Sequence, residues 1–334
     1  MTGPLVTSAE LGPPQVAAIL DLVRACRAAD GVAPLSEHVL LHLRYDSAAP
    51  PPPDQGRDFV LTVDGGVGGY AYLNPPAADP HSSTPEVSGE LLIHPDRRRQ
   101  GLGRALAAAA VAAADGHALR IWAHGDLPAA AALAAAAGFE RFRALWQLRR
   151  PLGPSAGPSA APPLADPALP AGRTLRTFVP GQDEDAWLAL NGRAFAKHPE
   201  QGGWTRHDLE LREREPWFDP AGFFIAEKIG EKVGEKDGVM TGFHWTKIHP
   251  PEPGTPALGE VYVVGVDPAE QGSGLGRALT LAGLHHLREH GIDQAMLYVD
   301  EDNVPAIRMY EALGFTRAKV DAMYRRPPAA PSPD

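Results

Sequence analysis

The chain has 334 residues, of which 44% are hydrophobic and 22% charged, with 35 glycines, 35 prolines and a formal net charge of −10. This length favours two domains, the apolar content excludes a disordered chain, and the acidic balance excludes a general basic surface for nucleic acid or an anionic membrane. A single cysteine, Cys26, excludes an internal disulfide framework and a multi-cysteine zinc site. The sequence shows no secretory signal and no long apolar stretch, so we expect a cytoplasmic protein.

The predicted elements follow one order in each half of the chain. Each half opens with a helix whose apolar residues are three and four apart, over residues 14–29 and again over 184–196. Two short strands with glycine-rich turns follow, then a longer apolar strand, a glycine-rich loop and an alanine-rich helix. A short strand, another helix, the dipeptide Gly-Phe and a last strand complete each half. We therefore expect a mixed α/β fold that occurs twice.

A stretch rich in proline, alanine, glycine and serine separates the halves. Residues 151–172 read PLGPSAGPSAAPPLADPALPAG and have no hydrophobic period, which predicts a semi-rigid extended linker. The expected domains are residues 1–150 and 173–326, followed by a tail over 327–334.

The two halves also resemble each other in sequence. Residues 91–106 (LLIHPDRRRQGLGRAL) align without a gap with 264–279 (VGVDPAEQGSGLGRAL), and seven of the sixteen positions are identical. A second ungapped match places residues 121–139 on 297–315. Duplication of one module explains both matches.

Each repeat contains a glycine-rich loop between a strand and a helix, RRQGLG at 98–103 and QGSGLG at 271–276. Glycines let main-chain N–H groups approach an anion closely, and the helix N-terminus adds partial positive charge, so a pyrophosphate suits such a loop. Neither loop has the lysine and hydroxyl of a nucleoside-triphosphate loop, and neither is followed by the acidic residue that holds a nicotinamide ribose. Glycine-rich turns also occur for packing reasons, but recurrence in both halves favours a function.

These loops, together with Asn303-Val304-Pro305-Ala306 and Tyr310 ahead of the residues LGF at 313–315, resemble the GNAT-type acetyltransferase superfamily. The resemblance implies two tandem acyl-CoA N-acyltransferase domains (α+β), each a mixed, mainly antiparallel sheet flanked by helices, and acetyl-CoA as co-substrate. In that superfamily the loop binds the pyrophosphate, the preceding strand splays to hold the pantetheine, and a later helix faces the thioester. The implied cofactor contacts are Leu91, Leu92, Ile93, Arg99, Gln100, Gly101, Leu102, Gly103 and Arg104 in the first half, and Val264, Gly265, Val266, Gln271, Gly272, Ser273, Gly274, Leu275, Gly276, Arg277, Asn303, Val304, Pro305, Ala306, Ile307 and Arg308 in the second.

The resemblance also implies which half is catalytic. Glu260 and Tyr310 stand where family members commonly place a base and a phenol that protonates the departing thiolate, although a solvated carboxylate and a packing tyrosine are the plain alternatives. In the first half Tyr310 aligns with alanine and Asn303 with leucine. Glu86 is one residue out of phase with Glu260, which in a regular strand turns it to the opposite face. We expect the first half to bind acetyl-CoA without catalysing a reaction.

Four strings, HPEQGGW (198–204), GFHWTKIHP (242–250), GEVYVVGVDP (259–268) and LYVDEDNVPAIRMYEALGF (297–315), resemble the mycothiol synthase (mycothiol acetyltransferase) family. That family acetylates the cysteinyl amine of a cysteine–glucosamine–inositol pseudodisaccharide. The implied substrate contacts are Glu37, Glu200, Lys247, Glu260 and Tyr298. Carboxylates, a lysine and a phenol suit a polyhydroxylated substrate with one protonated amine. Because Glu37 lies in the first half, this hypothesis requires both halves to contribute to substrate binding.

Other interpretations stay open. Glu37 also fits an acid in the first turn of a helix, and Glu200 and Lys247 fit solvated charges. The rival functions are acetylation of another amine, such as an aminoglycoside, a polyamine or a protein N-terminus, and a two-site acetyl-CoA sensor without activity. No metal is expected, because no carboxylate completes a helical ligand pair with His285, His286 or His290. The expected partner is a small molecule, with no nucleic acid and no membrane, and the protein is expected to be a monomer.

Overall fold

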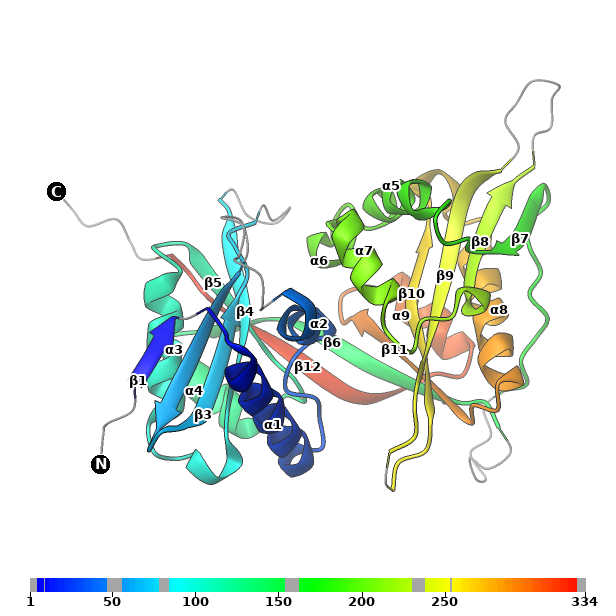
Figure 1. Cartoon of the computed structure of the whole chain (residues 1–334). Helices are drawn as coiled ribbons and strands as arrows, with labels where there is room; N and C mark the ends of the chain where they lie inside the picture. The colour runs from blue at the N-terminus through cyan, green and yellow to red at the C-terminus, as the bar shows by residue number, and fades with distance from the viewer. Residues whose placement is uncertain are drawn as a thin grey trace. The chain divides into compact units, whose positions relative to one another are not determined.

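The computed structural model describes residues 5–8, 10–46, 56–77, 84–153, 162–229, 238–252 and 254–328. The chain divides into two compact units (Figure 1). Unit 1 consists of Met1–Leu145 and Val320–Asp334, and unit 2 of Trp146–Lys319. Within the described ranges, none of the helices combines the length and the apolarity needed to span a bilayer.

Unit 1 is a mixed sheet between helices. Its strands lie in the order β1-β2-β3-β4-β5-β12, in which β4 and β5 run parallel and the other neighbours antiparallel. Leu106 of α3 lies in the core on one face of the sheet, and Ile19 and Leu22 of α1 lie in the core on the other. The elements are β1 (Leu5–Ser8), α1 (Pro13–Asp30), α2 (Glu37–Leu41), the π-helical segment η1 (His42–Asp46), β2 (Arg57–Val63), β3 (Gly66–Leu73), β4 (Glu86–Ile93), η2 (Pro95–Arg97), α3 (Leu102–Ala113), β5 (Ala118–Ala123), α4 (Pro128–Ala136) and parts of β6 (Glu140–Pro151) and β12 (Thr316–Arg326).

Unit 2 repeats this arrangement with a larger aromatic core. Its strands lie in the order β6-β11-β10-β9-β8-β7, in which β10 and β11 are parallel and β7 to β10 are antiparallel. Helices α5 and α7 cover one face with Trp187 and Leu209, and α8 and α9 cover the other, as Figure 1 shows. The elements are β7 (Arg173–Thr177), α5 (Glu184–Ala194), α6 (Pro199–Gly202), α7 (Arg206–Glu213), η4 (Pro220–Gly222), β8 (Phe223–Lys228), β9 (Val239–His249), β10 (Leu258–Val266), η5 (Pro268–Glu270), α8 (Leu275–Glu289), β11 (Gln294–Asp300) and α9 (Val304–Ala312). The expected fold, two mixed and mainly antiparallel sheets flanked by helices, is confirmed.

The last strand of the chain completes the sheet of unit 1. Residues 322–326 of β12 pair antiparallel with residues 119–123 of β5. Strand β6 likewise starts in unit 1 and ends in unit 2. The compact units therefore differ from the expected domains 1–150 and 173–326, because pairing between strands so distant in the chain leaves no local signal in the sequence.

The segment expected to be a linker is in part packed. Residues 154–161 lie outside the described residues, and residues 162–172 belong to unit 2 without forming a helix or strand. Leu164 and Leu169 pack against apolar clusters of unit 2, and His285 Nε2 donates to the carbonyl oxygen of Ala165 at 2.9 Å. This part of the proline-rich segment is therefore anchored to unit 2.

Two groups of buried charges connect β12 with the rest of unit 1. Glu86, 2% exposed, accepts a hydrogen bond from Arg325 Nη2 at 2.6 Å and lies 3.3 Å from Arg120 Nε. His124 Nδ1 lies 3.1 Å from Asp321 Oδ2, and its Nε2 lies 3.7 Å from Glu90 Oε2. Removing one partner of such a buried pair leaves an uncompensated charge away from water, which lowers the stability of the fold.

The His124 cluster predicts a pH-dependent stability. Burial by itself lowers the pKa of His124, but hydrogen bonds and charges from Asp321 and Glu90 outweigh it and raise the pKa to about 10. A pKa above the ordinary 6.5 means that protonated His124 stabilises unit 1 fully below pH 6.5, and that this contribution is lost as the pH rises towards 10. We expect the free energy of unfolding of unit 1 to fall by a few kcal/mol, to order of magnitude, across this window.

Urea unfolding at several pH values, followed by amide exchange in β5 and β12, measures this loss. His124→Gln is the matched variant, because glutamine does not titrate and its stability should change less over the same window. An equal pH dependence in both proteins would contradict the assignment.

Candidate active site

Strands β10 and β11 diverge in unit 2. Within the described residues they pair at Gly259 with Ala295 and at Glu260 with Met296, although β10 continues to Val266. Among the described residues, β10 has no ladder partner on β11 after Glu260. Open backbone N–H and C=O groups on such an edge can accept an extended chain that carries amides. The divergence therefore suits a pantetheine-like molecule beside Val264, Gly265 and Val266.

A β-bulge sets the direction of Glu260. The register between β9 and β10 shifts between Val261 and Val263. A Cβ at Gly259 would lie 2.8 Å from Leu287 of α8, whereas a Cβ at Gly265 would lie 2.7 Å from Phe243 on the other side. Residues six apart share a face in a regular strand, so the extra residue of the bulge has reversed the alternation. Glu260 consequently points to the face away from α8.

Strand β4 of unit 1 has no such shift in its pairing with β3, and it pairs with β5 from Glu86 to Glu90. Val87 packs in the cluster that contains α3, so its neighbour Glu86 points to the face away from α3. The expectation that Glu86 turns to the face opposite that of Glu260 is therefore wrong. The bulge lies in β10 of unit 2, and the pairing of β4 with β3 in unit 1 has none. Glu86 is instead bound by two arginines.

Glu260 lies beside a histidine that the sequence analysis did not single out. Glu260 is 7% exposed, and its Oε2 is 2.7 Å from Nε2 of His249 on β9. The signal was available in the sequence, because His249 alternates with Lys247 in GFHWTKIHP and alternate strand residues share a face. A carboxylate hydrogen-bonded to an imidazole can take a proton from an amine, directly or through water.

Lys247 is held by aromatic rings. It is 8% exposed, and its Nζ lies 4.2 Å from the ring centroid of Trp217 and 4.9 Å from that of Tyr262. The hydroxyl of Tyr262 accepts a hydrogen bond from Arg212 Nε at 2.8 Å. Lys247 is also the cross-strand partner of Glu260. The alternative of a solvated strand-end charge therefore does not hold for Lys247, and Trp217, Tyr262 and Arg212 are neighbours that sequence reasoning missed.

Tyr298 shares the face of Glu260. Met296 pairs with Glu260, and Tyr298 follows two residues later, while Leu297 packs on the opposite side in the cluster of α8 and α9. Tyr298 is 43% exposed, and its hydroxyl accepts a hydrogen bond from Gln147 Nε2 at 2.8 Å. Lys247, Glu260 and Tyr298 therefore lie together on one face of the sheet of unit 2.

The other two expected substrate residues belong to helices rather than to the sheet. Glu200 belongs to the short helix α6 of unit 2, where its carbonyl oxygen accepts a hydrogen bond from the indole of Trp204 at 3.1 Å. Glu37 is the first residue of α2 in unit 1, and the N–H of its neighbour Ser36 donates to Glu90 at 2.7 Å. A carboxylate in the first turn of a helix is also favoured by the helix dipole.

The glycine loops take the same turn in both units. Gly274 (φ 88°) precedes α8, as Gly101 (φ 81°) precedes α3. Apart from adjoining residues, no atom of the described part of the chain lies within 4 Å of a Cβ added at either glycine. Gly272 has φ 80°, and Arg99 at the corresponding position has φ 63°. The N–H groups in the first turn of each helix have no partner inside the helix, which makes each loop able to bind a phosphate. The side chains of Gln271, Arg277, Arg99 and Arg104 are exposed beside these loops.

Helix α9 begins at the expected asparagine. Asn303 caps the helix, its side-chain oxygen accepting a hydrogen bond from the N–H of Ala306 at 3.2 Å. The side chain of Ile307 lies in the core, and its backbone N–H donates to the carbonyl oxygen of Asn303 at 3.0 Å. Tyr310 is 6% exposed and packs against Phe315, and burial raises the pKa of its phenol well above the ordinary value. Tyr310 therefore keeps its proton at neutral pH.

Comparison with known proteins agrees with this geometry. Residues 189–315 match the acetyltransferase (GNAT) family, and residues 54–141 match the acetyltransferase (GNAT) domain. A mycothiol acetyltransferase of Thermobispora bispora is 55% identical over 311 residues, which cover 92% of this chain and 95% of the relative. The chain belongs to the mycothiol acetyltransferase family.

A second member of this family, from Thermomonospora curvata, is 53% identical over 324 residues, covering 97% of this chain and 98% of the relative. A solved tandem GNAT protein from the clavulanic acid biosynthesis pathway has a TM-score of 0.68 and 25% identity, covering 99% of this chain and all of that chain. Membership of the family makes the chain an N-acetyltransferase with a GNAT domain in each half and acetyl-CoA as the acetyl donor.

Proposed function

We propose that the protein transfers the acetyl group of acetyl-CoA to the cysteinyl amine of a cysteine–glucosamine–inositol pseudodisaccharide, which yields mycothiol. The observation that carries the proposal is the position of Glu260 at the point where β10 leaves β11, with Lys247 and Tyr298 on the same face. The identity of 53–55% to mycothiol acetyltransferases over nearly the whole chain supports the choice of substrate.

The reaction needs a base and an acid, and unit 2 has a candidate for each. In the proposal the neutral amine attacks the carbonyl carbon of the thioester, and Glu260 takes the proton that the nitrogen loses. The N–C bond forms and the C–S bond breaks, and Tyr310 gives its proton to the departing CoA thiolate. His249, hydrogen-bonded to Glu260, orients the carboxylate. This route is a direct attack without a covalent enzyme intermediate.

We propose that the two units bind acetyl-CoA but that unit 2 alone reacts. Unit 1 would hold the cofactor along residues 91–93 and 99–104, and unit 2 along 264–266, 271–277 and 303–308. Three features support an inactive unit 1. Ala134 replaces the phenol, Leu127 replaces the amide of Asn303, and Glu86 is neutralised by arginines. A base engaged in this way has no free charge to offer an amine.

The proposed substrate contacts are those that the resemblance implied. In unit 2, Lys247 supplies a fixed cation beside Glu260, Tyr298 supplies a phenol, and Glu200 supplies a carboxylate. Hydroxyl groups of a sugar and an inositol donate to carboxylates and accept from ammonium and phenol groups, so these residues of unit 2 can bind several hydroxyls. Glu37, on α2 of unit 1, is proposed on the resemblance alone.

Release of CoA by the full-length protein tests the proposed function. We expect turnover with the cysteinyl pseudodisaccharide, and loss of turnover with the glucosamine–inositol that lacks the cysteinyl amine. Mass spectrometry of the product should place the acetyl group on the cysteinyl nitrogen. An equal kcat/KM for a polyamine or an aminoglycoside would contradict the substrate, and bound acetyl-CoA without CoA release from any amine would indicate a sensor.

A further inference from the structure

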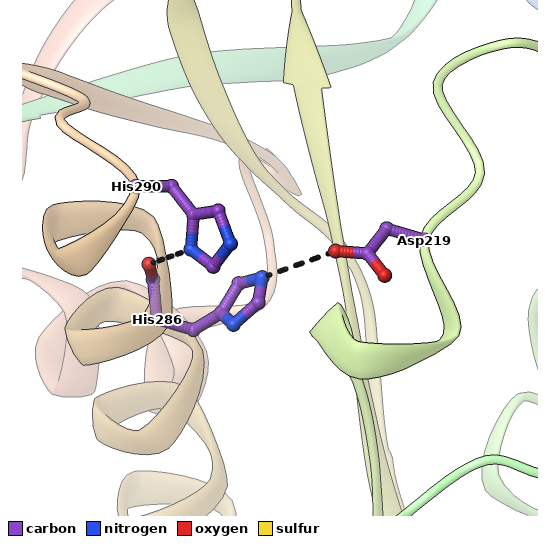
Figure 2. Close-up of side chains that lie close together, drawn as sticks. All are labelled: Asp219, His286 and His290. Atoms are coloured by element: carbon purple, nitrogen blue, oxygen red, sulfur yellow. Dashed lines mark hydrogen bonds and ion pairs between the residues drawn. The ribbon is translucent and has the colours of Figure 1, made fainter.

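The C-terminal end of α8 presents two histidines to an aspartate from another part of the chain. His286 and His290 are one helical turn apart, and Asp219 lies directly before η4 (Figure 2). His286 Nε2 is 3.8 Å from Asp219 Oδ2, and the two imidazole rings are 4.1 Å apart between centroids. One ligand atom from each of the three side chains lies within 4.8 Å of the other two.

The orientation of His290 is set by a hydrogen bond. Its Nδ1 is 2.8 Å from the backbone carbonyl oxygen of His286, which can only accept, so Nδ1 carries the proton. The lone pair is then on Nε2, and Figure 2 shows this nitrogen on the side of Asp219. A histidine that donates one ring N–H to a carbonyl and directs the other nitrogen outward has the arrangement common in metal sites.

We propose that Asp219, His286 and His290 bind a divalent transition-metal ion, with Zn²⁺ as the best match. Two imidazole nitrogens and one carboxylate oxygen are ligands that Zn²⁺ prefers, and water would complete the tetrahedron. Mg²⁺ and Ca²⁺ prefer sites made of oxygen atoms and fit this set poorly. The sequence of the helix alone predicts no metal, because the carboxylate comes from the segment that leads into β8.

Binding requires a small contraction of the site. Zinc–ligand bonds of about 2.1 Å at tetrahedral angles place ligand atoms about 3.4 Å apart, less than the 4.8 Å limit within which the three atoms lie. The movement falls on Asp219, whose side chain is 49% exposed, and on the exposed His290. His286, with a side chain 10% exposed, stays in place against the core.

The ion would act as a structural clamp. It would connect the C-terminal end of α8 to the segment that leads into β8, whereas the glycine loop is at the other end of this 15-residue helix. A helix of this length spans about 22 Å, so the ion would lie at the end of α8 opposite to the glycine loop. Leu287, next to His286, packs under Gly259, so the ion would lie on the face of the sheet opposite to Glu260. A ligand that binds the folded state stabilises it, and we expect the metal to stabilise unit 2.

Titration of the chelator-treated full-length protein tests the site. By calorimetry we expect one equivalent of Zn²⁺ to bind, and Asp219→Asn and His290→Gln each to weaken the binding at least 10-fold. Co²⁺ should give visible absorption bands in the wild type that both variants lose, and Mg²⁺ should give no heat of binding. His285→Gln is the matched control, because His285 lies on the same helix but is bonded to Ala165. It should bind Zn²⁺ as the wild type does.

Thermal unfolding gives a second measurement. Without metal the variants should unfold close to the wild-type temperature. Asparagine keeps the oxygen with which Asp219 accepts a hydrogen bond from the N–H of Ala221, and His290 is exposed. With Zn²⁺ the transition of the wild type and of His285→Gln should rise, and those of Asp219→Asn and His290→Gln should not. The proposal is overturned if the wild type binds Zn²⁺ no more tightly than Asp219→Asn, or if His285→Gln loses the ion equally.

Discussion

Replacement of Glu260 by glutamine is expected to lower kcat for acetyl transfer by about 10²-fold to 10⁴-fold, which is the usual contribution of general-base catalysis. Glutamine keeps the shape of the side chain and can still bond to His249, but it cannot accept the proton of the amine. The affinity for acetyl-CoA should stay unchanged, because the proposed cofactor contacts begin at Val264. Steady-state kinetics of CoA release, combined with calorimetry of acetyl-CoA, measures both quantities.

Two further variants separate the proposed roles. His249→Gln should lower kcat less than Glu260→Gln, because the carboxylate remains and loses only its orienting partner. Tyr310→Phe should lower kcat without changing substrate KM, because the buried phenol supplies a proton to the leaving thiolate rather than binding energy. A wild-type kcat in Glu260→Gln would remove Glu260 as the base, whatever the other variants do.

Replacement of Gly274 by aspartate is expected to raise KM for acetyl-CoA by about 10²-fold. Gly274 has φ 88° and open space around a Cβ, and aspartate tolerates this left-handed conformation better than most residues. The new carboxylate would face the pyrophosphate that the loop is proposed to bind. Two charges about 4 Å apart near a surface repel by about 4 kcal/mol, and salt reduces this value. The measurement is the KM for acetyl-CoA at fixed amine and fixed ionic strength.

Gly101 provides the matched position in unit 1, with φ 81° and equally open space. Gly101→Asp should leave turnover close to that of the wild type and lower the number of acetyl-CoA molecules bound from two to one. Gly274→Asn and Gly101→Asn are the uncharged controls, because asparagine has the shape of aspartate without its charge. Both variants should bind acetyl-CoA nearly as the wild type does. Loss of turnover in Gly101→Asp, with normal turnover in Gly274→Asp, would assign the reaction to unit 1.

Local patterns were sufficient to predict the repeated module. The glycine loops, the cap at Asn303 and the alternation along the strands each depend on residues that are close in sequence, so the pattern carries the structure directly. The family resemblance added Glu260, Lys247 and Tyr298, and the structure brings these three to one face of one sheet. Their roles in substrate binding stay predictions.

The error on Glu86 shows where such patterns fail. Counting residues along a strand predicts the face of each side chain only if the strand alternates without interruption. The bulge in β10 reverses the faces on which the residues before it lie. The bulged residues 261–263 are two valines and a tyrosine, and none of them is a glycine or proline that would mark the shift. The bulge is visible only in the pairing of β10 with β9.

By itself, the sequence determined the repeat, the order of elements, the two phosphate-type loops and the family, because these depend on short-range spacing and on residue type. Only the tertiary structure decided that 322–326 complete the sheet of unit 1, that aromatic rings hold Lys247, that His249 bonds to Glu260, and that Asp219 meets the histidines of α8. Each of these contacts joins residues from different elements. The free energy of these contacts comes from burial and pairing that arise once the sheets have formed. The local spacing of residues in the chain does not predict such contacts.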